Sequence, residues 1–280
     1  MNRDARIPAG DEGDLLELAL TATQTAGGIL MRARDRSVQA GASAHKSSPT
    51  DPVTEADTAA QHAIADSIGR SRPHDALLGE EQLSRTGSTR WRWVIDPLDS
   101  TVNYLRGADQ FAVSIAAEDE NGAAVGVVHA PALSRTYSAI RGKGARINGR
   151  RLTVRRGVPL SAALVGTGFS YLTAGRERQA TALVRVLPRV ADIRRSGPAA
   201  LGLAAVADGT IDAFYEDDLQ AWDWMAGSLL VTEAGGVVSP LSGPDGSGVL
   251  AAGPELHRGL ASLLNAADWQ LRESLPGSAR

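Results

Sequence analysis

Three runs typical of β-strands follow one another in the first half of the chain, at residues 111–117, 123–130 and 135–140, with no helical run between them. Residues 141–153 then carry two more short runs on either side of Asn148-Gly149, a dipeptide typical of a two-residue hairpin turn. Strands joined by short turns pair antiparallel, whereas a strand-helix-strand repeat places a helix in every connection. The chain is therefore not a pure alternating α/β repeat.

Helical periodicity surrounds these strands. Apolar residues recur at spacings of three and four through 14–36, and a second helix is expected at 55–68. Between them, the polar stretch 40–54 contains two prolines and predicts an extended loop. Further helices are expected at 176–187, 199–207, 223–234 and 254–264, and further strands at 91–96, 165–168, 192–195, 213–215, 236–238 and 249–251. The predicted fold class is α/β (α+β layers), with helices layered on mixed, largely antiparallel sheets.

The length and charge of the chain indicate how many domains it has and which partners it can bind. A length of 280 residues predicts one domain over 11–271 with two subdomains, roughly 11–150 and 151–271, a flexible arm at 1–10 and a flexible tail at 272–280. With 29 basic and 32 acidic residues there is no excess charge for nucleic acid, and no apolar run could span a membrane or form a secretory leader. We therefore expect a cytoplasmic protein with no nucleic-acid or membrane partner.

Acidic residues gather at three places, at Glu80-Glu81, at Asp96 and Asp99, and at Asp223. Taken singly, Asp99 and Asp223 are explained as helix N-caps and Glu80-Glu81 as a solvated turn. Taken together, several acids need a compensating cation, and oxygen ligands without Cys or His companions favour Mg²⁺. The absence of cysteine also excludes a thiol nucleophile and a Cys-built metal site.

The motifs GEE, DPLDSTVNY and AWDWMAGSLLVTEAGG, together with KSSPTDPVTEAD, resemble the inositol monophosphatase family. The resemblance extends from about Lys46 to Gly236 with the motifs in the family's order. The runs LVGTGFSY, RERQA and RRSGPAALGLAAVADGTIDAFYE are most similar to its actinobacterial SuhB-type branch. The resemblance to the family implies its fold, the inositol monophosphatase/fructose bisphosphatase-like αβαβα layered sandwich.

The resemblance also implies a role for each matching residue. Asp57 and Thr101 would orient the attacking water and, with Glu80, form the catalytic set. Lys46 would lie near the substrate entrance, although a surface lysine is an equally good explanation. The implied metal ligands are Glu80, Asp96, the Leu98 carbonyl, Asp99 and Asp223. The implied substrate-binding residues are Leu98, Asp99, Ser100, Thr101, Gly197, Pro198, Ala199, Glu216 and Asp223.

The implied activity is Mg²⁺-dependent hydrolysis of inositol monophosphate to inositol and phosphate by a homodimer with two or three Mg²⁺ per subunit and sensitivity to Li⁺. A strong general base is not required, and His45, His62, His74, His129 and His257 are expected to be structural or exposed. Alternatives are another phosphate ester, namely histidinol phosphate, fructose 1,6-bisphosphate or a 3′-phosphoadenosine nucleotide, or a non-catalytic regulatory protein. A carboxylate at Glu216 favours a polyol over a second phosphate.

Two residues depart from the family's pattern. Ser100 stands where the family usually has glycine, so a positive φ there would be strained and a helical φ would be harmless. Pro198 stands where a small Ser or Thr is common, and it has no N–H to donate, which leaves the Ala199 N–H and Glu216 for the substrate. We also expect Trp91, Trp93, Trp222 and Trp224 to wall a dry site.

Overall fold

The computed structural model describes residues 11–42, 44–45, 52–242, 248–265 and 270–271. Lys46, the predicted arm at 1–10 and the predicted tail at 272–280 lie outside this part. The larger of the two main sheets has eight strands in the order β10-β9-β8-β7-β6-β5-β3-β4. They are β3 (Ala76–Gly79), β4 (Ser84–Arg85), β5 (Arg92–Asp99), β6 (Ala112–Asp119), β7 (Gly122–Ala130), β8 (Arg135–Ile140), β9 (Gly144–Ile147) and β10 (Arg150–Arg151). Only β3 and β5 pair parallel, so the predicted antiparallel character of this region is confirmed.

The predicted hairpin at Asn148-Gly149 is present. These two residues join β9 to β10, and both have positive φ, 46° and 84°. Positive φ at both central positions is the type I′ turn, whose twist matches that of the flanking strands. The dipeptide therefore fixes the end of the sheet.

The second sheet has six strands in the order β12-β11-β13-β15-β14-β16. They are β11 (Leu164–Thr167), β12 (Asp192–Arg194), β13 (Ala213–Glu216), β14 (Val237–Ser242), β15 (Gly248–Ala252) and β16 (Gln270–Leu271). β11 pairs parallel with both β12 and β13, and the remaining pairs are antiparallel. The carboxyl ends of β11, β12 and β13 thus lie at one edge. A two-stranded sheet, β1 (Ala44–His45) with β2 (Pro52–Val53), precedes α2.

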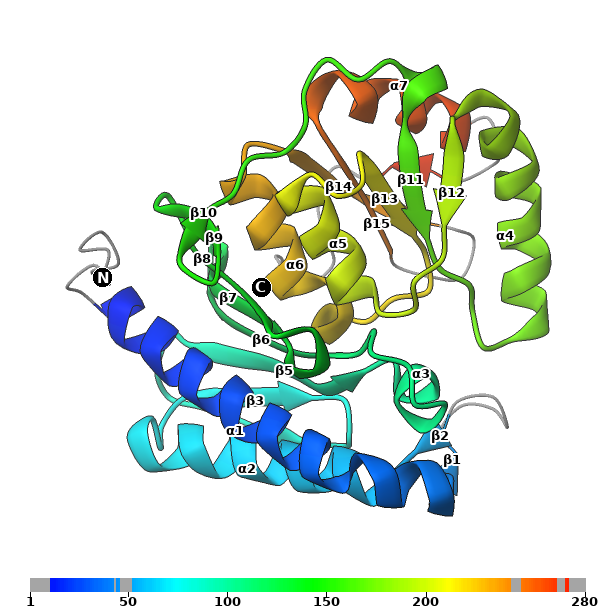
Figure 1. Ribbon diagram of the computed structural model, residues 1–280. Helices are drawn as coiled ribbons and strands as arrows, with labels where there is room; N and C mark the ends of the chain where they lie inside the picture. The colour runs from blue at the N-terminus through cyan, green and yellow to red at the C-terminus, as the bar shows by residue number, and fades with distance from the viewer. Residues whose placement is uncertain (1–10, 43, 46–51, 243–247, 266–269, 272–280) are drawn as a thin grey trace.

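Helices form three layers around the two larger sheets (Figure 1). The helices are α1 (Asp11–Ala40), α2 (Glu55–Ser71), α3 (Thr101–Leu105), α4 (Thr173–Val186), α5 (Ala199–Asp208), α6 (Ala221–Glu233) and α7 (Pro254–Asn265). The outer layer α1 and α2 packs on one face of the large sheet, α5 and α6 lie between the sheets, and α4 and α7 cover the far face of the second sheet. The order is therefore the expected αβαβα.

Strand β5 shows how sequence alternation makes these layers. Trp93 and Ile95 are buried in the core beneath α1 and α2, whereas Val94 faces the core formed with α5 and α6. Successive side chains of a strand point to opposite faces, so one strand serves two cores. The strand also runs three residues beyond its predicted end, to Asp99.

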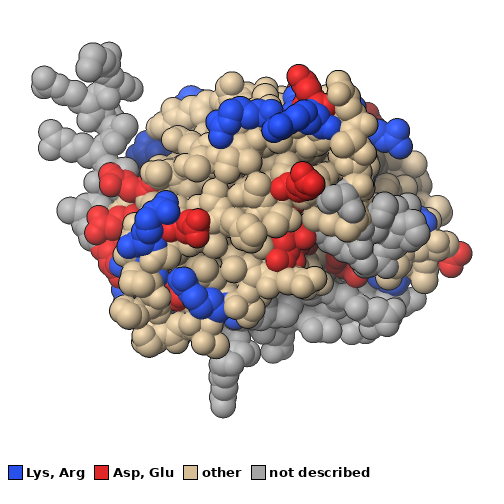
Figure 2. All heavy atoms as spheres, turned by 90° about the horizontal axis from the view of Figure 1, so that it is seen from below, with Lys and Arg blue, Asp and Glu red and all other residues tan. Residues whose placement is uncertain are grey.

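The outer face of α1 and α2 is seen directly in Figure 2, where acidic and basic side chains both occur and much of the face is uncharged. No helix in the described part of the chain is long and apolar enough to cross a membrane.

Candidate functional site

A cavity of about 360 Å³ lies where the acidic end of the large sheet meets the edge of the second sheet. Its walls include ten of the residues predicted from sequence: Glu80, Asp96, Leu98, Asp99, Ser100, Thr101, Gly197, Ala199, Glu216 and Asp223. Pro198 is buried at the N-cap of α5 and does not line the cavity. Asp57 also lies behind the wall and is joined to it through Thr101.

The large sheet supplies the first group of acids. Glu80 directly follows β3, and its N–H donates to the Ile95 carbonyl of β5 at 3.2 Å. Because β3 and β5 are parallel, their carboxyl ends reach the same edge. The pairing of β5 with β6 is irregular between Asp96 and Asp99, where the Leu98 N–H donates to Asp96 Oδ1 at 2.9 Å. This turn brings the two aspartates to the cavity.

Asp57 and Thr101 form a buried pair. Asp57 lies in the first turn of α2, where its Oδ2 accepts from the Thr54 N–H at 3.0 Å in a capping box. The other oxygen, Oδ1, accepts from the Thr101 hydroxyl at 3.0 Å. The capping box fixes the carboxylate, and the carboxylate in turn fixes the direction of the Thr101 hydroxyl hydrogen.

The cavity acids repel one another in a dry environment. Burial raises the pKa of Asp99 to about 7, with Glu80 adding repulsion and with the N–H groups of Ala200 and Ala199 and the charge of Arg195 opposing the rise. Burial, and then repulsion from Asp99 and Glu80, raises the pKa of Asp223 well above its usual value. Carboxylates in this state are stabilised by a bound cation.

Glu216 occupies the opposite wall, at the end of β13. Burial raises its pKa to about 8, against the charge of Arg195, and its Oε2 has no hydrogen-bond partner among the described residues. A Cβ on Gly168, at the end of β11, would lie 2.0–2.1 Å from the Glu216 carboxyl group. The glycine thus makes room for this carboxyl against the neighbouring strand.

The two departures from the family's pattern have different outcomes. Ser100 has φ 74° and ψ 60°, so it adopts the left-handed conformation that strains any residue with a Cβ. Pro198 has φ −68° and starts α5 without strain. The Ala200 N–H donates to Asp99 Oδ2 at 2.8 Å and the Ala199 N–H also bonds Asp99, so the Ala199 donor expected for the substrate is already engaged.

Sequence reasoning missed several residues of the wall. Arg195 is the only basic residue among the described residues that line the cavity, and it directly follows β12, while residues 169–172 follow β11. The signal was present, since both stretches end strands that pair parallel with neighbours, but the strand order had to be known first.

The prediction that four tryptophans wall the site is wrong for three. Trp222 lines the cavity, whereas Trp224 is buried in the core around α5 and α6. Trp91 and Trp93 lie under α1 and α2 and donate to Asp11 and Asp75. Alternate residues of a strand face opposite sides, so Trp93 points with Ile95 into the core under α1 and α2, and the sequence does not state which face holds the acids.

None of the four histidines whose side chains are described lines the cavity. His62 and His74 are exposed. Burial lowers the pKa of His129 and of His257. In the described part of the chain no three acidic or histidine side chains already enclose a common point at metal-ligand spacing.

Comparison with known proteins agrees with this arrangement. Residues 11–270 match the sequence profile of the inositol monophosphatase family. The inositol-1-monophosphatase SuhB of Mycobacterium tuberculosis is 44% identical over 236 residues, 80% of this chain and 81% of that protein. The Nus factor SuhB of Pseudomonas aeruginosa is 40% identical over 239 residues, 82% of this chain and 86% of that protein.

A solved structure agrees as well. The extragenic suppressor protein SuhB of Bartonella henselae superposes with a TM-score of 0.82 at 34% identity, covering 90% of this chain and 98% of that one. Sequence profile, relatives and three-dimensional similarity all cover most of the chain, so the chain belongs to the inositol monophosphatase family.

Proposed function

We propose that the protein is a Mg²⁺-dependent phosphomonoesterase that hydrolyses inositol monophosphates to inositol and phosphate. The observation that carries the proposal is the cavity itself, in which buried acids from both sheets face one another with raised pKa values. Oxygen ligands from several carboxylates, without cysteine or histidine among them, suit a hard divalent cation. Family membership supports the substrate class.

The proposed metal ligands are the carboxylates of Glu80, Asp96, Asp99 and Asp223 and the Leu98 carbonyl, for two or three ions. Held by these groups, Mg²⁺ would supply a water of lowered pKa and positive charge against the phosphoryl group. The excess of acids around the cavity is the evidence that the site fits such ions, because Arg195 is the single basic residue opposing them among the described residues that line it.

In this proposal Asp57 and Thr101 orient the attacking water. The Thr101 hydroxyl donates its hydrogen to Asp57, so its oxygen is left to accept a hydrogen from water. A water held in this way presents a lone pair away from Thr101, toward the cavity. Asp57 needs only to remain ionised, and no histidine is required.

The alcohol part of the substrate is proposed to lie against the second sheet, near Gly197 and Glu216. Glu216 lines the cavity and its buried Oε2 has no hydrogen-bond partner among the described residues, so we assign its carboxyl group to a substrate hydroxyl. Asp99 already engages the Ala199 N–H, so Asp99 itself, beside that helix start, would contact the alcohol. Resemblance to the family supports three further parts of the proposal: a homodimer, sensitivity to Li⁺, and a cytoplasmic location.

Two alternatives have specific observations in their favour. Arg195 on the same wall as Glu216 would suit a substrate with a second anionic group, such as fructose 1,6-bisphosphate. The relatives named Nus factor SuhB, together with the strained Ser100, favour a regulatory protein on the same fold. Histidinol phosphate and 3′-phosphoadenosine nucleotides remain alternatives for the same chemistry.

The decisive experiment is phosphate release from inositol 1-phosphate with and without Mg²⁺, beside histidinol phosphate, fructose 1,6-bisphosphate and a 3′-phosphoadenosine nucleotide. We expect inositol 1-phosphate to be preferred and Asp96→Asn to abolish its turnover. A preference for fructose 1,6-bisphosphate would identify that ester as the substrate in place of inositol monophosphate. Folded protein that binds Mg²⁺ but releases no phosphate from any ester would contradict an enzymatic function.

A further inference from the structure

Ser100 lies at a position of the cavity where its side chain is costly to the backbone. It follows Asp99 at the end of β5 and precedes α3, with φ 74° and ψ 60°. Glycine adopts this conformation freely, whereas a Cβ there is strained. Strain at a residue that lines a cavity motivates a search for what its side chain does.

The Ser100 hydroxyl lies beside Gly197, in the second half of the chain. Its Oγ lies 2.9 Å from where a Cβ on Gly197 would be, and Gly197 itself has φ 118°. Asn103 stabilises this contact, because its amide donates to the Ser196 carbonyl at 2.9 Å and to the Gln110 carbonyl at 2.7 Å. Two residues with positive φ thus lie side by side, Ser100 with a hydroxyl group and Gly197 with no side chain.

The hydroxyl has no structural duty that accounts for it. Ser100 is the N-cap of α3 but its side chain makes no capping bond, and among the described residues its Oγ has no hydrogen-bond partner. It is only half-buried, so a ligand in the cavity can reach it. A hydroxyl can both donate and accept, which suits another hydroxyl group.

The neighbours of Ser100 indicate which part of a ligand it would meet. Glu80 and Asp96 belong to the large sheet and face the proposed metal and phosphoryl end, whereas Gly197 and Glu216 belong to the other half. The Oγ of Ser100 lies beside Gly197, one of this second group. We propose that the Ser100 hydroxyl is a specificity-determining contact that hydrogen-bonds the hydroxyl-bearing alcohol part of the substrate; the inference rests on the proposed function.

The test uses two substitutions that separate the hydroxyl from the strained backbone. Ser100→Ala removes Oγ and keeps the Cβ, while Ser100→Gly removes both. Each is assayed with inositol 1-phosphate and with phenyl phosphate, whose alcohol part carries no free hydroxyl group, and with inorganic phosphate as a competitive inhibitor. Melting temperatures are measured alongside.

We expect both substitutions to lower kcat/KM for inositol 1-phosphate by about three- to tenfold, mostly through KM, which is the range for one neutral hydrogen bond. Turnover of phenyl phosphate and inhibition by inorganic phosphate stay unchanged. Only Ser100→Gly raises the Tm. The split between substrates and the opposite stability results together exclude a merely structural role.

An equal loss with both esters, or weaker inhibition by inorganic phosphate, would mean that Ser100 contacts the phosphoryl group and would overturn the inference. Full activity of Ser100→Ala toward inositol 1-phosphate would also overturn it. Failure of the proposed function is distinguished from both, because it appears in the unsubstituted protein as absence of Mg²⁺-dependent phosphate release.

Discussion

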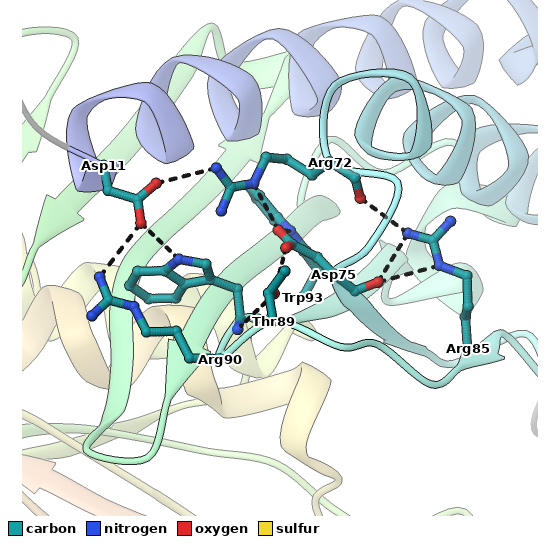
Figure 3. Close-up of polar contacts among 8 residues, drawn as sticks. Asp11, Arg72, Asp75, Arg85, Thr89, Arg90 and Trp93 are labelled. Atoms are coloured by element: carbon teal, nitrogen blue, oxygen red, sulfur yellow. Dashed lines mark hydrogen bonds and ion pairs between the residues drawn. The ribbon is translucent and has the colours of Figure 1, made fainter.

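Two regions of the molecule bury aspartates, and they treat the charge in opposite ways. Asp75, after α2, is 1% exposed, and Figure 3 shows it enclosed by Arg72, Thr89 and Trp93. Thr89 Oγ1 donates to it at 2.6 Å, Trp93 Nε1 at 3.0 Å and Arg72 Nε at 2.9 Å. Burial raises the pKa of Asp75, but these three donors outweigh it and hold the pKa below its usual value.

Asp99 is also buried, yet its pKa is raised to about 7, because burial and the Glu80 charge outweigh its two backbone donors. The difference lies in the partners that the chain supplies. Around Asp75 the fold provides a cation, and Asp11 joins the same network through Arg72 and Arg90. Around Asp99 it provides more acids. A buried carboxylate satisfied by the chain stabilises the fold, whereas one left repelled marks a place for a cation.

The largest expected effect follows from removing a cavity acid. Asp223→Asn should lower Mg²⁺-dependent turnover by about a thousandfold or more, because a charged ligand beside the reacting group is lost. The same substitution should raise the Tm of the metal-free protein, because it removes repulsion from Asp99 and Glu80. The asparagine Oδ1 can still accept from the Gln220 N–H, so the start of α6 is kept. A lower Tm of the metal-free variant would contradict the claim that repulsion among the cavity acids destabilises the protein.

The same exchange in the other region should act in reverse. Asp75→Asn removes the charge that pairs with Arg72, which is itself 27% exposed, and should lower the free energy of unfolding by about 2 to 3 kcal/mol. Turnover per folded molecule should remain within about twofold of the unsubstituted protein, because Asp75 is not among the residues that line the cavity. Urea unfolding with parallel activity assays measures both. Arg72→Met is the matched control, and lost turnover in folded Asp75→Asn would contradict the division of roles.

The pH dependence of stability should also separate the two regions. In the folded protein the pKa of Asp99 is raised to about 7 and that of Glu216 to about 8. At pH values between the ordinary pKa of a carboxyl group and these raised values, the metal-free folded state therefore binds more protons than the unfolded chain. Stability from these groups is therefore present at about pH 4 and lost as the pH rises toward about 8. The lowered pKa of Asp75 works the other way, since its stabilisation is lost only as the pH falls below about 4.

Differential scanning calorimetry between about pH 5 and pH 8, with and without Mg²⁺, measures this dependence. His129 and His257, whose pKa values are lowered, oppose the trend near their usual range but contribute equally to both series. The difference between the series should grow with pH. A difference that stays constant from pH 5 to pH 8 would show that the cavity acids do not bear the repulsion.

The sequence carried most of the fold because its signals were local. Alternation along β5, the Asn148-Gly149 turn and the periodicity of α1 each depend on residues within one element, and each is observed. The four-residue strand β3, which aligns Glu80 with Asp96, was missed because it is too short for alternation to be distinctive. Sequence alone also left the φ of Ser100 undecided, since both outcomes were open until the backbone was known.

The site was predicted less completely because its remaining contacts are long-range. The bond from the Ala200 N–H to Asp99 joins residues 101 positions apart, and nothing local in the sequence indicates it. Arg195 entered the wall only through the parallel pairing of β11 with β12. Motifs identified the acids, but which groups oppose them depends on strand order.

The smallest predicted effect concerns the wall opposite the metal ligands. Gly168→Ala would place a methyl group 2.0–2.1 Å from the Glu216 carboxyl group and force it to move. Because Glu216 is proposed to bind the alcohol part and not the metal, KM for inositol 1-phosphate should rise about tenfold while kcat changes little. Gly259→Ala, at a glycine without positive φ where the added Cβ would lie 4.0 Å from its nearest neighbour, is a control for the cost of the methyl group itself. If Gly168→Ala instead abolished kcat and left KM unchanged, Glu216 would belong with the acids that hold the cation, and the contrast between paired and repelled carboxylates would extend across the whole cavity.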